Sequence, residues 1–140
     1  MRYYSTNHSV PEVTLRDAVV KGLAADRGLY MPERIERLPQ EFFDNIDKLS
    51  LQDIAVHVAE AFFGDDVDAD ALESIVRDTL SFDTPVVEVE KDLYCLELFH
   101  GPTLAFKDVG ARFMARLLQY FISKDADPRT VNVLVATRGD

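Results

Sequence analysis

The feature that most constrains the fold is a pair of apolar runs, each of strand length, with a helical pattern between them. The first run, Leu93–Phe99, is followed at once by the breakers Gly101 and Pro102. The second run, Val131–Ala136, is too apolar for a strand with one face in water and is typical of a central parallel strand. The apolar residues between the runs recur at helical spacing and are Phe106, Val109, Phe113, Met114, Leu117, Leu118 and Phe121. The order strand, helix, strand predicts the start of a doubly wound parallel sheet in an α/β domain.

Functional loops in a sheet of this kind follow the carboxyl ends of the strands. Lys107 lies just past the first predicted strand, and Thr137, Gly139 and Asp140 lie just past the second. A right-handed strand–helix–strand unit brings both strand ends to one edge of the sheet. We therefore expect the two loops to share one crevice.

Lys107 has two interpretations on spacing alone. Most lysines are solvated surface charges, and a lysine near a helix start is usually one of them. The neighbours Ala105, Phe106 and Val109 are apolar, however, and a partly desolvated amine loses its proton more easily. Such an amine is the free nucleophile that a Schiff base requires.

The turn before the predicted helix contains further polar residues. Thr103 or a neighbour is the expected helix cap, and Asp108 suits the positive end of the helix dipole. His100 lies between the strand and the breakers, where it either shapes the turn or transfers protons. Cys95, inside the first predicted strand, is expected to be a small buried residue rather than a reactive thiol.

The first part of the chain predicts a small, mostly helical lobe. Short strands are expected at Arg2–Ser5 and Leu29–Pro32. Thr14 and Ser50 each precede an acid by three residues and are expected to cap helices. A further helix is predicted over Ala69–Leu80. The stretch from Phe82 to Pro85 is the expected boundary, which divides the chain into a lobe over 1–84 and the beginning of an incomplete α/β domain over 85–140.

Composition limits the classes of partner. The formal charge of −10 argues against binding to nucleic acid or to an anionic membrane surface. No segment is long and apolar enough to span a bilayer and the N-terminus lacks a signal-peptide core, so we expect a soluble, cytoplasmic protein. The acidic stretch 65–68 has no calcium-loop spacing and is interpreted as helix capping, so no metal site is expected.

Two stretches resemble segments of the threonine synthase family. Residues 97–108, Glu-Leu-Phe-His-Gly-Pro-Thr-Leu-Ala-Phe-Lys-Asp, resemble the segment that carries the pyridoxal-phosphate lysine. Residues 4–7, Tyr-Ser-Thr-Asn, and 22–32, Gly-Leu-Ala-Ala-Asp-Arg-Gly-Leu-Tyr-Met-Pro, resemble the opening segment of the same family. The two segments occur in the expected order, which indicates the N-terminal part of such a protein, with the fold typical of the tryptophan synthase β group.

The resemblance implies a lyase of threonine biosynthesis. Lys107 would hold pyridoxal 5'-phosphate as a Schiff base, and O-phospho-L-homoserine and water would become L-threonine and phosphate. Thr137, Gly139 and Asp140 match a loop that binds the substrate carboxylate in the family, whereas Arg138 stands where the family usually has serine. The loop for the cofactor phosphate and the group facing the pyridine nitrogen match nothing in these residues.

Two alternatives to threonine synthase remain. One is another pyridoxal-phosphate enzyme of the same fold, such as a dehydratase, and the other is a binding module without catalysis. We expect the chain to be part of a longer protein and to be inactive by itself. Its uncovered apolar surfaces predict self-association.

Overall fold

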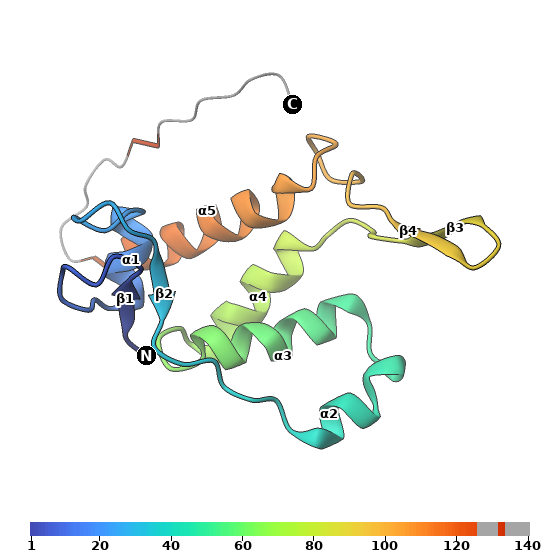
Figure 1. Cartoon of the computed structure of the whole chain (residues 1–140), viewed down its shortest axis with the longest axis horizontal. Coiled ribbons are helices and arrows are strands. Elements are labelled where there is room, and N and C mark those ends of the chain that lie inside the picture. Colours follow the sequence, from blue (N-terminus) through green and yellow to red (C-terminus); the bar gives the residue numbers. More distant parts are fainter. Residues whose placement is uncertain (126–131, 134–140) are drawn as a thin grey trace. The chain divides into compact units, whose positions relative to one another are not determined.

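The computed structural model of the chain describes residues 1–125 and 132–133. The described residues form a mixed α/β structure with two antiparallel sheets of two strands each (Figure 1). The chain divides into two compact units, Met1–Asp78 and Thr79–Asp140.

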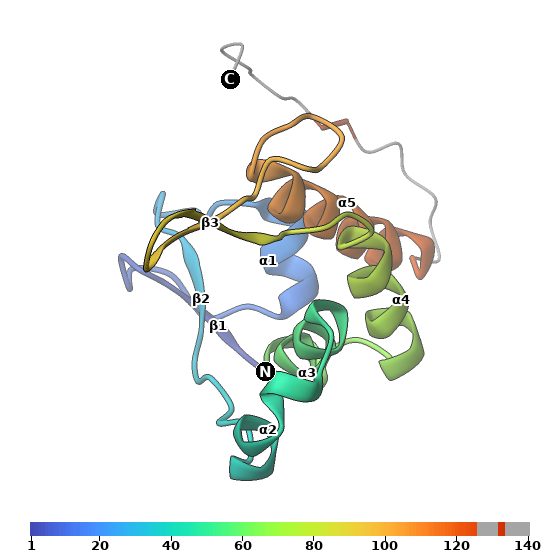
Figure 2. The same ribbon diagram turned by 90° about the vertical axis from the view of Figure 1, so that its right-hand side faces the viewer.

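The small sheet of the first unit joins two segments that are far apart in the sequence. Strand β1 (Tyr3–Ser5) pairs antiparallel with β2 (Tyr30–Pro32), and Tyr3 lies opposite Pro32 (Figure 2). Tyr3 also bridges Val13, immediately before helix α1 (Leu15–Lys21). Both strands were predicted from the sequence, and both predictions are confirmed.

The helices of the first unit begin where local capping chemistry predicts. The Thr14 hydroxyl accepts a hydrogen bond from the backbone N–H of Asp17 at 3.1 Å, and Ser50 does the same for Asp53 at 3.1 Å. Each cap satisfies a backbone donor that the first helical turn leaves unpaired. The remaining elements are α2 (Gln40–Asp44), the 3-10 helix η1 (Ile46–Lys48), α3 (Leu51–Phe63) and α4 (Ala69–Thr79).

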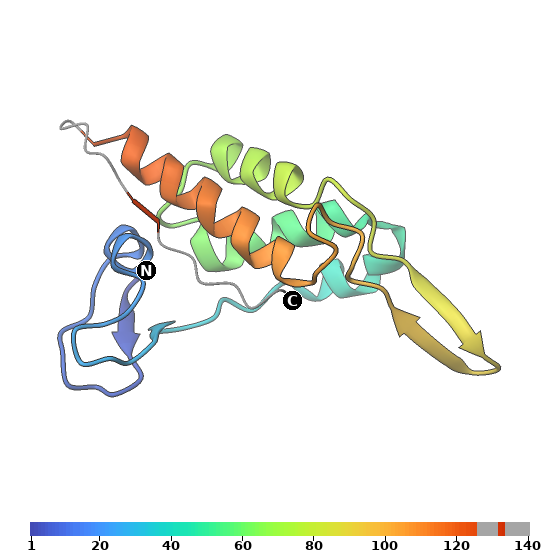
Figure 3. The ribbon, with the colours of Figure 1, turned by 90° about the horizontal axis from the view of Figure 1, so that it is seen from above.

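Helices α3 and α4 lie side by side (Figures 1 and 3). The Arg77 guanidinium of α4 donates to the Asp53 carboxylate of α3 at 2.9 Å, and within α4 it donates to Glu73 at 2.7 Å. Leu72, Ile75 and Val76, which share one face of α4, are buried.

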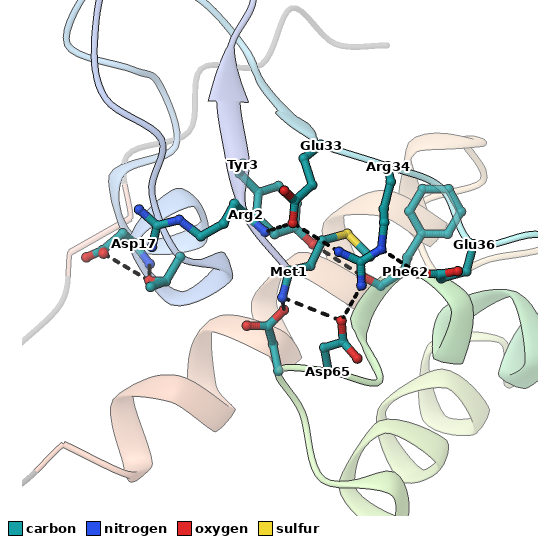
Figure 4. Close-up of polar contacts among 11 residues, drawn as sticks. Met1, Arg2, Tyr3, Asp17, Glu33, Arg34, Glu36, Phe62 and Asp65 are labelled. Carbon is teal, nitrogen blue, oxygen red and sulfur yellow. Dashed lines mark hydrogen bonds and ion pairs between the residues drawn. The ribbon is translucent and has the colours of Figure 1, made fainter.

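The N-terminal segment of the first unit is fixed by polar contacts with the turn after α3 (Figure 4). The Tyr3 hydroxyl donates to the Phe62 carbonyl at 3.2 Å. Burial, together with the nearby Asp66 and Asp65 carboxylates, raises the pKa of Tyr3 to about 12. The Met1 amino group lies 3.2 Å from Asp66, and Asp65 accepts a hydrogen bond from Arg34 at 3.0 Å. The acids of this turn therefore face cations of the chain itself.

Two loops of the first unit are joined through one carboxylate. Asp26 accepts hydrogen bonds from the Ser5 hydroxyl at 2.6 Å, the Gly28 N–H at 3.0 Å and the Ser9 N–H at 3.0 Å. A Cβ on Gly28 would lie 2.0 Å from the Ser5 Oγ and 3.0 Å from the backbone nitrogen of Asn7. Only glycine lets the two loops approach this closely.

The second unit begins with a hairpin, which corrects the predicted parallel strand. Strand β3 (Val86–Glu90) pairs antiparallel with β4 (Leu93–Leu96), which ends three residues before the predicted run does. Two residues connect the strands, and the second, Asp92, has a φ of 64°. A two-residue loop with positive φ reverses the chain and therefore joins antiparallel strands. No parallel pairing occurs among the described residues.

The hairpin is also exposed, where the sequence predicted burial. Every residue of β3 and β4 is exposed, and the ribbon extends away from helix α5 (Lys107–Ser123) (Figure 3). Cys95, predicted to be buried, is exposed as well. Apolar character correctly indicated a strand, but the inference from apolar character to burial was wrong for the described residues.

Helix α5 confirms the predicted helical pattern, although its face is only partly covered. Leu117 and Phe121 are buried, whereas Met114 is 52% exposed. The predicted second strand, Val131–Ala136, falls almost wholly outside the described residues, and the two described members, Asn132 and Val133, are not in a strand. None of the helices described combines the length and the apolar character that crossing a bilayer requires.

We predict that Gly28→Ala lowers the free energy of unfolding by about 1–3 kcal/mol, because the added methyl overlaps the Ser5 hydroxyl. A double-mutant cycle with Ser5→Ala, followed by urea unfolding, isolates that overlap. The Gly28→Ala cost should be smaller in the Ser5→Ala background. Equal costs in both backgrounds would contradict the packing described for the two loops.

Acid should weaken the first unit through Asp26. The Ser5 hydroxyl, followed by the Gly28 and Ser9 amides, holds the pKa of the Asp26 carboxyl below its usual value. A lowered folded-state pKa stabilises the fold above the unfolded value of about 3.9, and this contribution is lost as the pH falls through the folded pKa. Urea midpoints measured from pH 7 to pH 3 should fall less steeply for Asp26→Asn than for the wild type. Parallel profiles would refute this assignment.

Candidate functional site

Lys107 is the first residue of α5, at the point where the loop that leaves β4 becomes helical. Its placement at a helix start confirms the local prediction. Of the two interpretations of Lys107, the described residues show the exposed one, because Lys107 is exposed and Phe106 is 65% exposed. The lysine side chain is therefore accessible from solvent in this unit.

A buried carboxylate lies next to Lys107 in the sequence. Asp108 is only 5% exposed, and its two oxygens accept hydrogen bonds from Thr103. The Thr103 N–H donates to Oδ2 at 2.9 Å, and the Thr103 hydroxyl donates to Oδ1 at 2.8 Å. We call this pair of contacts the carboxylate clamp.

The carboxylate clamp replaces the helix cap that the sequence predicted. The N-cap position of α5 is Phe106, which makes no side-chain capping hydrogen bond. Thr103 instead uses its hydroxyl on Asp108, across the loop that precedes the helix. Asp108 lies in the first helical turn, as predicted, where the helix dipole favours a negative charge.

The loop inside the clamp is tightly folded. The Leu104 N–H donates to the Gly101 carbonyl at 3.0 Å, and Leu104 adopts a positive φ of 60°. A Cβ on Gly101 would lie 2.4 Å from Oδ2 of Asp108. Gly101 therefore packs its bare backbone against the carboxylate, which explains the glycine of the Gly-Pro pair.

His100 is fixed by two neighbours. Its Nε2 lies 2.7 Å from Oε2 of Glu97, and its ring stacks on Phe99 with the centroids 4.8 Å apart. Both contacts lie within the loop between β4 and α5. They are consistent with the interpretation that His100 shapes the turn, and a role in proton transfer stays an untested hypothesis.

Apolar side chains of the loop between β4 and α5 are exposed to solvent. Leu104 is 74% exposed and Phe99 is 49% exposed. The predicted substrate residues Thr137, Gly139 and Asp140, together with Arg138, lie outside the described residues. The shared crevice therefore stays a prediction. The described part of the chain holds no group of three or more metal-ligating side chains.

The residue that sequence reasoning undervalued is Asp108. The sequence assigned it only a dipole interaction, whereas the fold buries it as the anchor of the loop. The available signal was Thr103 five residues earlier, with Gly101 before it, since a small donor and a glycine allow a loop to close on a carboxylate.

Comparison with known proteins places these features in a family. The family model described as the threonine synthase N terminus matches residues 2–80. Threonine synthase from Escherichia coli strain K12 is 39% identical over 140 residues, which cover 100% of this chain and 32% of that protein. Threonine synthase from Saccharomyces cerevisiae is 35% identical over 156 residues, and the match covers 99% of this chain and 30% of that protein. The chain thus spans about a third of the length of these relatives.

Solved structures give the same assignment. The PLP-bound threonine synthase from Brucella melitensis matches with a TM-score of 0.82 and 35% identity, over 89% of this chain and 28% of that one. The threonine synthase from Escherichia coli matches with a TM-score of 0.80 and 39% identity, over 86% and 28% of the two chains. The mixed α/β structure therefore corresponds to the N-terminal region of these proteins.

Gly101→Ala should open the loop before α5. The added methyl would overlap Oδ2 of Asp108, and we expect a loss of about 1–3 kcal/mol in unfolding free energy from this overlap. Hydrogen exchange should show faster exchange of the Thr103 amide. Gly110→Ala is the matched control, because no described atom outside its own helix backbone lies within 4 Å of the place that its methyl would take. A Gly101→Ala protein with unchanged Thr103 protection would contradict the close packing.

Proposed function

The chain belongs to the threonine synthase family, in which it corresponds to the N-terminal portion, and we propose that Lys107 is the lysine that carries pyridoxal 5'-phosphate in the complete protein. The complete protein would convert O-phospho-L-homoserine and water into L-threonine and phosphate. The observation that supports this proposal most is the position of Lys107 at the start of α5, directly beside the buried Asp108. A fixed peptide and an exposed amine are what covalent attachment of a cofactor requires.

The described residues fit one part of a cofactor site. Lys107 supplies a primary amine on an accessible side chain, and the carboxylate clamp fixes the peptide from which it extends. The N-terminus of a helix is also a local region of positive potential in a chain with a net charge of −10. The contacts to the cofactor phosphate and ring are not assigned to any described residue.

Pyridoxal phosphate, when bound, supplies the electron sink that stabilises carbanions of the substrate. Lys107 would hold the cofactor through its Nζ and, once the amine is free, would move protons at the substrate. In the proposed reaction, phosphate would leave from the γ carbon of O-phospho-L-homoserine and water would add at the β carbon, which gives L-threonine.

Beyond Lys107, the proposal includes the loop that follows α5 in the sequence. Thr137, Gly139 and Asp140 are proposed to bind the substrate carboxylate through hydroxyl and backbone donors. Arg138 stands where the family usually has serine, and its two interpretations, a donor to the carboxylate or a solvent-facing side chain, stay open.

Cofactor trapping tests the proposal directly. The complete gene product is titrated with pyridoxal phosphate, reduced with borohydride and mapped by peptide mass spectrometry. We expect the label on Lys107, and Lys107→Ala should abolish both the label and the formation of threonine from O-phospho-L-homoserine. Lys91→Ala is the matched control, because Lys91 is an exposed lysine in the turn of the same unit's hairpin.

The alternatives predict different results in the same experiment. Labelling of Lys107 without threonine formation, but with turnover of another amino acid, would indicate a different lyase of the same fold. No label on Lys107 at saturating cofactor would reject the enzyme assignment and favour the binding module.

A further inference from the structure

We propose that Asp108 is the positioning residue of Lys107, and that the carboxylate clamp sets the rate at which the lysine amine reaches the cofactor carbonyl. This inference rests on the proposed function of Lys107 and adds a second residue to that site. Both oxygens of Asp108 accept hydrogen bonds from Thr103, so Asp108 is not assigned a contact with the cofactor. It affects the reaction through the position of Lys107.

Asp108 is buried and its carboxylate is hydrogen-bonded through both oxygens. A carboxylate that is only 5% exposed loses hydration, and this cost is tolerated when the charge is hydrogen-bonded. Both oxygens meet that requirement through one residue, which donates its backbone N–H at 2.9 Å and its hydroxyl at 2.8 Å. The carboxylate is therefore a firm anchor.

The carboxylate clamp joins residues five positions apart, whereas the backbone hydrogen bonds in the first turn of α5 join residues three positions apart. Phe106, at the N-cap position, contributes no side-chain capping hydrogen bond. The backbone N–H of Asp108 bonds the Ala105 carbonyl at 3.1 Å, and that of Val109 bonds the Phe106 carbonyl at 3.4 Å. Both of these bonds span three residues. The clamp instead connects the start of the helix to Thr103, in the loop before it.

The carboxylate clamp also closes a tight loop before α5. Gly101 leaves no room for a Cβ beside Oδ2, and the Leu104 N–H closes a turn on the Gly101 carbonyl at 3.0 Å. A shift of Asp108 would therefore require the whole turn to move. Since Lys107 and Asp108 share a peptide bond, the backbone orientation of the lysine follows from the same contacts.

Positioning of this kind affects the rate of bond formation. The neutral lysine nitrogen attacks the aldehyde carbon of the cofactor, a C=N bond replaces the C=O bond, and the carbonyl oxygen leaves as water with the two amine protons. The attack needs a narrow range of distance and angle, and a misplacement of about 1 Å costs roughly a hundredfold in rate. An anchored backbone keeps the start of α5 in place when the cofactor binds. Without the anchor, the start of the helix also moves, and this motion must be restricted before the bond can form.

Four variants of the complete gene product separate hydrogen-bond geometry from charge. Asp108→Ala removes the anchor, and Thr103→Val removes the hydroxyl but keeps the N–H and the carboxylate. Thr103→Ser keeps both donors. Asp108→Asn removes the charge, while its amide can still accept from the Thr103 N–H and donate to the Thr103 hydroxyl.

The measurement follows cofactor attachment by its visible absorbance after rapid mixing, at increasing pyridoxal phosphate, with borohydride trapping to confirm Lys107. At saturating cofactor, Asp108→Ala and Thr103→Val should attach it roughly 10- to 100-fold more slowly than the wild type. The half-saturating concentration should change little. Thr103→Ser and Asp108→Asn should keep most of the wild-type rate.

A purely structural role predicts a different result. If the clamp only kept the protein folded, the variants would show a smaller amplitude with an unchanged rate constant, and that outcome would overturn the proposal. Thr103→Val keeps the buried charge and one hydrogen bond, so it provides the test even if Asp108→Ala does not fold. A wild type that attaches no cofactor at Lys107 would refute the proposed function instead, so the two failures are distinguishable.

Discussion

The start of α5 depends on a single buried charge. Asp108 is 5% exposed and satisfied by Thr103, and this arrangement determines the loop before the helix, the need for glycine at position 101 and the backbone orientation of Lys107. An unpaired carboxylate at this depth would be costly. The hydrogen bonds that remove that cost are the same ones that order the residues around the lysine, so local stability and the placement of the amine have one cause.

The first unit uses the same device for a different purpose. Asp26 joins the loop after β1 to the loop before β2 through Ser5, Ser9 and Gly28. In both units a carboxylate accepts hydrogen bonds from small polar residues and backbone amides, and a glycine permits the close approach. Short loops of an acidic chain are thus ordered by turning its abundant carboxylates toward donors of the chain itself.

Helix caps and helix starts could be predicted from the sequence, whereas strand pairing and contacts across loops could not. Thr14 and Ser50 were identified as caps because capping depends on residues within one helical turn. The predicted parallel pairing of β4 was wrong, because the Lys91-Asp92 turn lacks the glycine that usually marks a two-residue hairpin. Lys107 was located correctly at a helix start. The anchor beside it was not found, because a contact between side chains five positions apart across a loop is decided by packing rather than by spacing.

The exposed hairpin has a consequence for how fluctuations travel along the chain. Every residue of β3 and β4 is exposed among the described residues, and the hydrogen bonds of exposed two-stranded ribbons are among the less protected ones of a fold. The loop that leads to Lys107 begins at the end of β4. The contacts between Thr103 and Asp108 lie between this hairpin and α5 in the sequence, so we expect opening of the hairpin to leave the start of the helix in place.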